Sequence, residues 1–304
     1  MNTLPTTPKD PPPPGAHGEG LLLRLTGPLQ SWGTHSHFNE RDTAAFPTLS
    51  GVLGLLACAL GRPRHAPTDD LARLSLTVRV DRPGVVLRDL HTVGGGLPPK
   101  ATVSTAEGKK RGGDTTTLLS HRTYLADAAF TCAVTGRPGN DADTRLITEC
   151  AQALRLPRWP LYLGRRSCPP EGPLLLGQSA EPLRHLVDLP VAAHPPRTAD
   201  TSGRSDRAPH MTVFLSDRPL GELPPPQGHT HHGPDTGAHP TSTINDLPSK
   251  PDGTRRTYRS RPLYRRTLPL PPTQFHGLGT TQLTALTTYM SEHLTPPNPW
   301  SPEQ

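Results

Sequence analysis

Apolar runs and alternating patterns along the chain predict several β-strands. Residues 21–25 (LLLRL) form a short apolar run of the kind that a buried strand shows. At 74–80 (LSLTVRV) leucine and valine alternate with serine, threonine and arginine, which predicts a half-buried strand. A further strand is expected at 209–217 (PHMTVFLSD), so the chain has the material for a sheet.

Apolar residues at helical spacing predict three helices. The first lies before Gly61, with Thr48 or Ser50 able to cap its start, and its stripe comprises Val52, Leu53, Leu56, Ala57 and Leu60. The other two cover 141–156 and 280–294. The first helix would direct backbone N–H groups past Ser50 and Gly51, which makes its N-terminus a candidate phosphate site.

Two strand-like arms flank a long polar stretch without apolar period, 94–117, which is rich in glycine, threonine and lysine. This arrangement predicts a protruding β-hairpin thumb over about 87–125. The order strand, helix, strand, hairpin, strand, helix, strand is that of an α+β fold with an RRM-like (ferredoxin-like) antiparallel sheet. Such sheets often bind single-stranded RNA, although the chain lacks the aromatic motifs of an RRM.

Proline is concentrated outside the apolar segments. The 304 residues include 40 prolines and are only 32% hydrophobic, so parts of the chain are not expected to fold. We predict a disordered Pro-rich arm at 1–19, an RRM-like core at 20–220 and a disordered His/Pro-rich insert at 221–254. A basic strand at 255–270 would close the core, and a helix and Pro-rich tail would occupy 271–304.

The charge balance favours a polyanionic partner. Lysine and arginine number 32 against 26 acidic residues, a net charge of +6. Six arginines fall within 255–266 with no acid among them. The competing interpretation of this run is an edge strand kept soluble by charge.

Other chemistries find little support. Four cysteines lie far apart, none in a C-x-x-C pair, which argues against a zinc ribbon or a disulfide framework. Histidines at 229, 231, 232 and 239 sit in the low-complexity insert, so we expect no structural metal and no cofactor. No apolar run reaches 18 residues and the N-terminus has no apolar signal core, which predicts a cytoplasmic protein without membrane contact.

The stretch 163–170 (LGRRSCPP) has three possible interpretations: a thiol nucleophile, half of a metal site or an anion-binding loop. Cys168 as a nucleophile would need a base nearby, and a small buried thiol is the simpler interpretation. Arg165, Arg166 and Ser167 after a glycine turn could hold a phosphodiester, or an arginine could pair with a carboxylate. Trp32 also has two interpretations. It could be part of the core, or it could stack on a base while Gln30 hydrogen-bonds a base edge.

Five blocks resemble the CasD family, the crRNA 5′-handle subunits of type I-E CRISPR Cascade complexes. They are GPLQSWG, RDTAAFPTLSGVLGLLACALG, LRDLHTV, YLADAAFTCAV and YLGRRSCP, in the family's order over about 21–176. The thumb tip at 95–117 does not match closely. The arm, the insert at 221–254 and the tail look like additions, so we expect that they can be deleted with little loss of handle binding.

The resemblance implies an RRM-like domain with a β-hairpin thumb, in the repeat-associated RNA-binding superfamily. Such proteins hold the crRNA 5′ handle, cap the CasC backbone and contact the large CasA subunit, meeting target DNA only through the assembled complex. CasE cuts the RNA in these systems, so no catalysis is expected here. The RNA-binding candidates are Gln30, Ser31, Trp32, Arg41, Ser50, Arg88, His91, Thr92, His121, Arg122, Tyr124, Arg165, Arg166 and Ser167.

The alternative is an enzyme. In the related type I-C systems the corresponding subunit is a metal-independent endoribonuclease that uses His, Tyr and Lys side chains to activate a 2′-hydroxyl. His91, His121, Tyr124 and Lys100 could be arranged in that way across the thumb base. The competing interpretation is that these histidines hydrogen-bond RNA or backbone.

Overall fold

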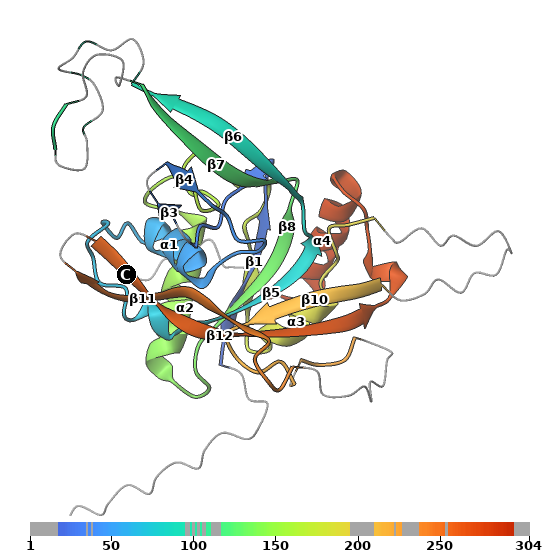
Figure 1. Cartoon of the computed structure of the whole chain (residues 1–304). Coiled ribbons are helices and arrows are strands. Elements are labelled where there is room, and N and C mark those ends of the chain that lie inside the picture. Colours follow the sequence, from blue (N-terminus) through green and yellow to red (C-terminus); the bar gives the residue numbers. More distant parts are fainter. Residues whose placement is uncertain are drawn as a thin grey trace, which may run out of the picture.

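A computed structural model describes residues 18–294 (Figure 1). The described residues exclude 35, 38, 95–97, 99–100, 102–103, 105–107, 111–116, 195–209, 222, 227–236 and 253–254. Most of the predicted arm at 1–19, most of the thumb tip and the tail after residue 294 therefore lie outside the described residues.

A seven-stranded sheet forms the body of the molecule, in the order β11-β12-β10-β5-β8-β1-β9. Every printed pairing in it is antiparallel. The strands are β1 (Gly20–Thr26), β5 (Ser75–Arg82), β8 (Ala129–Thr135), β9 (Leu175–Ser179), β10 (His210–Ser216), β11 (Ser242–Asp252) and β12 (Arg255–Leu270). The α+β class predicted from the sequence is confirmed.

Helices cover both faces of this sheet (Figure 1). They are α1 (Leu49–Ala59), α2 (Asp141–Arg155), α3 (Pro182–Asp188) and α4 (Thr280–His293), with short 3-10 turns at Leu71–Arg73 and Pro272–Gln274. Leu21, Leu23 and Leu25 join the core beneath α1 and α2, whereas Leu22 joins the core beneath α3 and α4. Alternate residues of one strand thus supply two cores, which explains the unbroken apolar run.

The predicted half-buried strand at 74–80 is buried on both faces, which corrects the expectation for its polar side. Arg79 is completely buried on the α3 face. Its guanidinium pairs with Asp81 at 2.6 Å and donates to the carbonyl oxygens of Leu186 and Leu189 at the end of α3. Arg79 therefore holds the end of α3 in place by hydrogen bonds, and the polar positions of this strand do not face solvent.

The predicted thumb is present as the hairpin of β6 (Val85–Val93) and β7 (Leu118–Ala126), which projects from the body (Figure 1). The base of β7 also pairs with β2 (Leu29–Gln30) and, in parallel, with β4 (Glu40–Arg41), which pairs in turn with β3 (Ser36–His37). Large apolar side chains on the hairpin are exposed, among them Val85, Val86, Leu90 and Leu119.

Part of the predicted disordered insert is a strand. Residues Ser242–Asp252 form β11, which pairs with β12 and lies against α1. The buried Asp246 carboxylate accepts hydrogen bonds from Arg261 Nε at 2.6 Å and from the Leu49 backbone N–H at 2.7 Å. The prediction of disorder at 221–254 is wrong here because composition does not reveal this buried pairing, and deleting the insert would remove β11.

None of the helices within the described part of the chain is both long and apolar enough to cross a membrane.

Candidate nucleic-acid interface

A groove of about 1650 Å³ runs beside α1, between the thumb base and the β11–β12 ribbon. Its wall on one side is the loop from Trp159 to Arg166, and the ribbon contributes Asn245 and Tyr258. None of its described lining residues is acidic, and six arginines line it: Arg41, Arg62, Arg64, Arg122, Arg165 and Arg166. Such a charge distribution suits a polyanion.

The loop that carries the predicted arginine pair is fixed by its backbone. Gly164 has φ +84°, and a Cβ at this position would lie 1.7 Å from the Ser31 carbonyl oxygen, so only glycine fits. The Leu163 N–H donates to the Cys168 carbonyl at 2.7 Å, and the Ser31 N–H donates to the Leu163 carbonyl at 3.1 Å. The turn predicted from the sequence is thus a loop that backbone hydrogen bonds hold to itself and to Ser31, directly after β2.

The two arginines of this loop differ in their surroundings. Arg165 Nη2 donates to the carbonyl oxygens of Arg41 and Asp42 at 2.9 and 3.1 Å, and its guanidinium lies 4.8 Å from the centre of the Tyr124 ring. Arg166 is exposed, lines the groove and makes no hydrogen bond or ion pair with the described residues. Arg165 therefore braces the fold through carbonyls and aromatic stacking, and Arg166 is available to a ligand.

Cys168 has the character of a structural residue. Its side chain is completely buried, and burial raises the pKa of its thiol despite the neighbouring Ser167 and Arg165. A protonated, inaccessible thiol is a poor nucleophile. Ser167 is exposed at the loop surface but is not among the residues that line the groove.

Three predicted RNA-binding candidates near the groove floor are buried, and the core interpretation of Trp32 is the one that agrees with the structure. Gln30 and Trp32 are completely buried, and the Trp32 Nε1–H donates to Gln30 Oε1 at 3.0 Å. Gln30 Nε2 donates to the backbone carbonyls of Leu25 and Ala128. Ser31 is also buried, and its hydroxyl donates to the Thr123 carbonyl at 3.1 Å. These side chains hold β1, β2 and β7 together and cannot stack on a base.

The predicted phosphate site at the N-terminus of α1 is also corrected. Thr48 caps the helix through its hydroxyl, which accepts from the Gly51 N–H at 3.3 Å. The Leu49 N–H is taken by the Asp246 carboxylate. A protein anion already occupies the helix terminus, so a phosphate would meet negative charge there. Ser50 is half-buried and lines the groove.

Strand register divides the predicted thumb residues between two faces. Asp89 lies opposite Arg122 and Leu87 opposite Tyr124, whereas Leu90 lies opposite His121. Because side chains alternate along a strand, His91, Arg122 and Tyr124 share one face. The other face carries Arg88, Thr92 and His121, and Arg88 forms an exposed pair with Glu40 at 3.4 Å. Of these thumb residues, only Arg122 lines the groove.

The same register separates the predicted nuclease residues. His91 and His121 lie on opposite faces of the hairpin, so they cannot act on one 2′-hydroxyl without rearrangement. Tyr124 is buried beneath Arg165. Lys100 lies outside the described residues. The arrangement that a metal-independent endoribonuclease would need is therefore not assembled by the three residues that are described.

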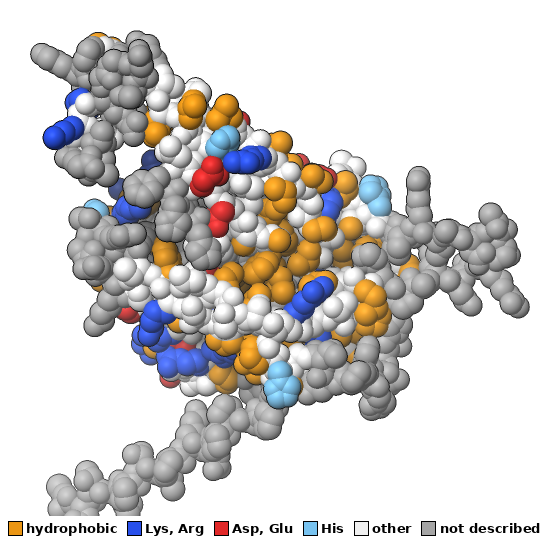
Figure 2. Space-filling view, viewed as in Figure 1, with side chains coloured by type: hydrophobic (Ala, Val, Ile, Leu, Met, Phe, Trp, Pro, Cys, Tyr) orange, Lys and Arg blue, Asp and Glu red, His pale blue; other side chains and the backbone are white. Residues whose placement is uncertain are grey.

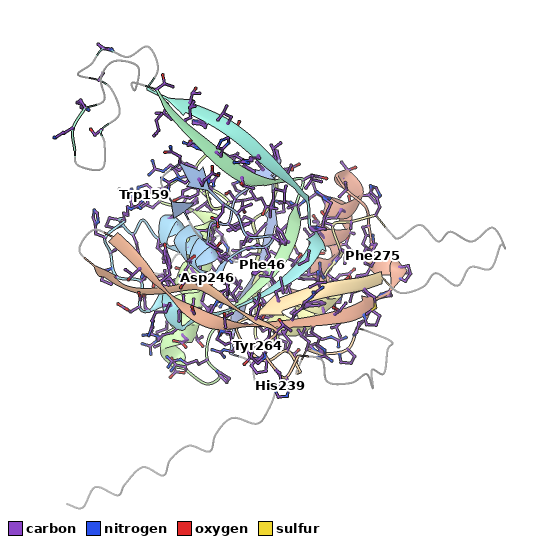
Figure 3. All side chains as sticks on the ribbon, in the orientation of Figure 1. Phe46, Trp159, His239, Asp246, Tyr264 and Phe275 are labelled. Carbon is purple, nitrogen blue, oxygen red and sulfur yellow. The ribbon has the colours of Figure 1, made fainter. Side chains whose placement is uncertain are left out.

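Several groove residues were not predicted from the sequence. Arg62 and Arg64 follow α1, and Trp159 and Tyr258 are exposed aromatic residues in an otherwise aromatic-poor chain. Figure 3 shows Trp159 beside α1, on the side away from the β11–β12 ribbon. Trp159, three positions before YLGRRSCP, was the one sequence signal that could have found this wall.

Comparisons with known proteins agree with one another. The family model described as CRISPR-associated protein (Cas_Cas5) matches residues 20–263. The CRISPR system Cascade subunit CasD of Escherichia coli (strain K12) is 37% identical over 212 residues, which are 67% of this chain and 90% of that protein.

Two solved structures are also similar. A chain of a CRISPR RNA-guided surveillance complex has a TM-score of 0.71 and 39% identity, covering 90% of this chain and 99% of that one. A structure described as a Cas protein has a TM-score of 0.50 and 30% identity, with 86% and 98% covered. The resemblance drawn from the sequence blocks is confirmed, and the chain belongs to the Cas5 family of CRISPR-associated proteins.

Proposed function

We propose that this chain is a non-catalytic subunit of a type I-E Cascade complex that holds the repeat-derived 5′ handle of the crRNA. The single observation that supports this most is the groove beside α1, which gathers six arginines and no acid among its described lining residues. Single-stranded RNA is bound by basic grooves that follow its backbone. Arg166 is the best phosphate contact in this groove because it is exposed and makes no internal pair among the described residues.

The fold in which this groove is built is best understood as RRM-like. Strands β1, β5, β8 and β9 occur in the order β5-β8-β1-β9, with α1 after β1 and α2 after β8. This is the strand order and alternation of a ferredoxin-like unit, and the thumb extends its β5–β8 hairpin. The ribbon β11–β12 and β10 then widen the sheet on the β5 side.

We further propose CasC and CasA as the protein partners, with target DNA met only in the assembled complex. The relatives support this through their names alone: a Cascade subunit and a chain of an RNA-guided surveillance complex. Exposed apolar residues of the thumb, which include Val86 and Leu90, are candidate contacts for the backbone subunit.

The test is the salt dependence of handle binding by the Arg166→Ala variant. Loss of one phosphate contact on a single strand lowers the slope of log affinity against log salt by about 0.7. Binding of labelled repeat-derived handle RNA to the purified full chain, measured over a series of salt concentrations, gives this slope. We expect weaker binding and a shallower slope for Arg166→Ala.

Arg145→Ala is the matched control, since Arg145 is exposed on α2 and does not line the groove. It removes the same charge from the chain, so it reports the effect of net charge alone. Equal slopes for the two variants would mean that Arg166 does not contact phosphate. Incubation of the wild-type chain with repeat RNA in EDTA completes the test, and site-specific cleavage would contradict the non-catalytic assignment.

A further inference from the structure

We propose that one nucleobase of the bound RNA lies on α1 at Gly54, bordered by the aromatic side chains of Trp159 and Tyr258. This inference rests on the proposed function and assigns a base-stacking subsite to one part of the groove. The groove is lined by both aromatic residues and by Gly54.

The two aromatic side chains are the primary observation. Trp159 is 40% exposed and Tyr258 is 39% exposed, although the chain has only three tryptophans and five tyrosines. They come from different elements, the loop after α2 and strand β12, and line a single cavity. Exposed aromatic residues within a basic groove are the usual platform on which proteins stack unpaired bases.

The floor between these walls has room for a flat ring. Every residue of α1 is buried except Ser50, Gly51 and Gly54. A Cβ built on Gly54 meets nothing within 4 Å, whereas a Cβ on Gly51 would lie 2.7 Å from the Trp32 ring. Gly51 is thus required by packing, whereas none of the described residues fills the space over Gly54.

A small side cavity next to Gly54 continues the proposed subsite toward the ribbon. It has a volume of about 40 Å³ and is lined by residues that include Gly54, Ala57, Arg64, Ser249 and Tyr258. Hydroxyl and guanidinium groups at its edge can hydrogen-bond the edge of a base. Apolar floor, aromatic border and polar rim together match an unpaired nucleobase better than a phosphate.

Phosphate contacts lie beside this floor. Arg166 is close enough to Cys58 of α1 for its charge to oppose the burial that raises the pKa of that thiol. Arg62 is held by a bidentate interaction with Asp70 and also lines the groove. A strand whose backbone follows Arg166 can therefore turn one base toward Gly54.

The test combines a scan of abasic RNA with a variant of the aromatic wall. Labelled handle RNAs, each lacking one base, are titrated against the wild-type full chain and against Tyr258→Ala. We expect one abasic position to weaken wild-type binding about fivefold or more, as loss of a stacked base does. At that position the loss should vanish in Tyr258→Ala, because the stacking partner is already absent.

Filling the floor gives a second, independent readout. Gly54→Leu places a side chain in the open space and should weaken handle binding by a similar factor. Gly54→Ala is its control: it should raise the denaturation midpoint, because alanine favours a helix over glycine, with little change in binding. Tyr258→Phe keeps the ring and should bind as the wild type does.

The outcomes separate this subsite from the function on which it rests. If Arg166→Ala weakens binding while Gly54→Leu and Tyr258→Ala bind normally, the subsite is wrong and the handle-binding function stands. An abasic loss that persists unchanged in Tyr258→Ala would also overturn the subsite. If neither Arg166→Ala nor these variants changes binding, the RNA does not use this groove at all.

Discussion

Two hairpins border the groove and are built in opposite ways. The ribbon β11–β12 contributes Tyr258 and is fastened to α1 by Asp246, which accepts the Leu49 N–H and is paired with Arg261 inside the ribbon; both side chains are almost completely buried. The thumb β6–β7 contributes Arg122 but leaves Val85, Val86, Leu90 and Leu119 exposed. Figure 2 shows apolar side chains at the surface along the thumb.

The difference indicates two roles. A wall whose buried carboxylate accepts a backbone N–H of α1 keeps a fixed distance from that helix, because moving it would leave the Leu49 N–H and one oxygen of Asp246 unpaired in a poorly solvated place. A hairpin whose large apolar residues are exposed is incomplete by itself and gains most from a partner. The ribbon thus shapes the groove, and the thumb is suited to carry Arg122 into an assembly.

Removal of the Asp246 carboxylate should have the largest effect. Asp246→Ala leaves the Arg261 guanidinium and the Leu49 N–H buried without their acceptor, which is expected to lower the free energy of unfolding by about 3–5 kcal/mol. Chemical denaturation of the full chain measures this loss. Glu40→Ala is the control, since it breaks the exposed Arg88–Glu40 pair and should cost less than about 1 kcal/mol.

Arg165→Ala should have an intermediate effect, at the point where the thumb base joins the body. It removes the donors to the carbonyl oxygens of Arg41 and Asp42, beside β4 and β7, and the stacking on Tyr124. We expect about 1–3 kcal/mol lower stability. Lysine should not restore it, because it lacks the planar fork. Unchanged stability would show that this brace is dispensable and that Arg165 belongs with Arg166.

The smallest effect on stability is expected on the thumb surface. Leu90→Ser changes a side chain that is 56% exposed, so the free energy of unfolding should stay within about 0.5 kcal/mol of wild type. Co-purification with the other Cascade subunits should nevertheless fall. Leu156→Ser, at an 87% exposed position after α2, is the control for loss of a surface leucine. Equal assembly by both variants would separate the thumb from partner binding.

The sequence predicted the thumb and the closing strand β12 at 255–270 but missed β11, the other half of the ribbon, and the reason is physical. The thumb arms and the main helices are local patterns, so their periods are visible in a few residues, and β6, β7, α1, α2 and α4 appear where they were expected. Strand β11 depends on Asp246 meeting Leu49 at the start of α1, 197 positions away along the chain. No local periodicity in the sequence reveals such a contact, and the prolines and histidines of the insert at 221–254 suggested disorder.

The candidate site shows the same limit. Arg122 and Arg166 were predicted and line the groove, but Gln30 and Trp32 proved to be internal supports. A short motif identifies a loop without saying which of its side chains turn inward. Arg165 and Arg166 are neighbours in the sequence, yet Arg165 donates hydrogen bonds to backbone carbonyls whereas Arg166 faces solvent.

The hydrogen bond between Leu49 and Asp246 joins residues 197 positions apart. During synthesis, α1 emerges from the ribosome long before the strand that closes its N-terminus and forms one wall of the groove. The groove is therefore complete only when most of the chain has been made. A nascent chain that ends before β11 would carry the groove arginines without Asn245 and Tyr258, which the ribbon adds to the groove.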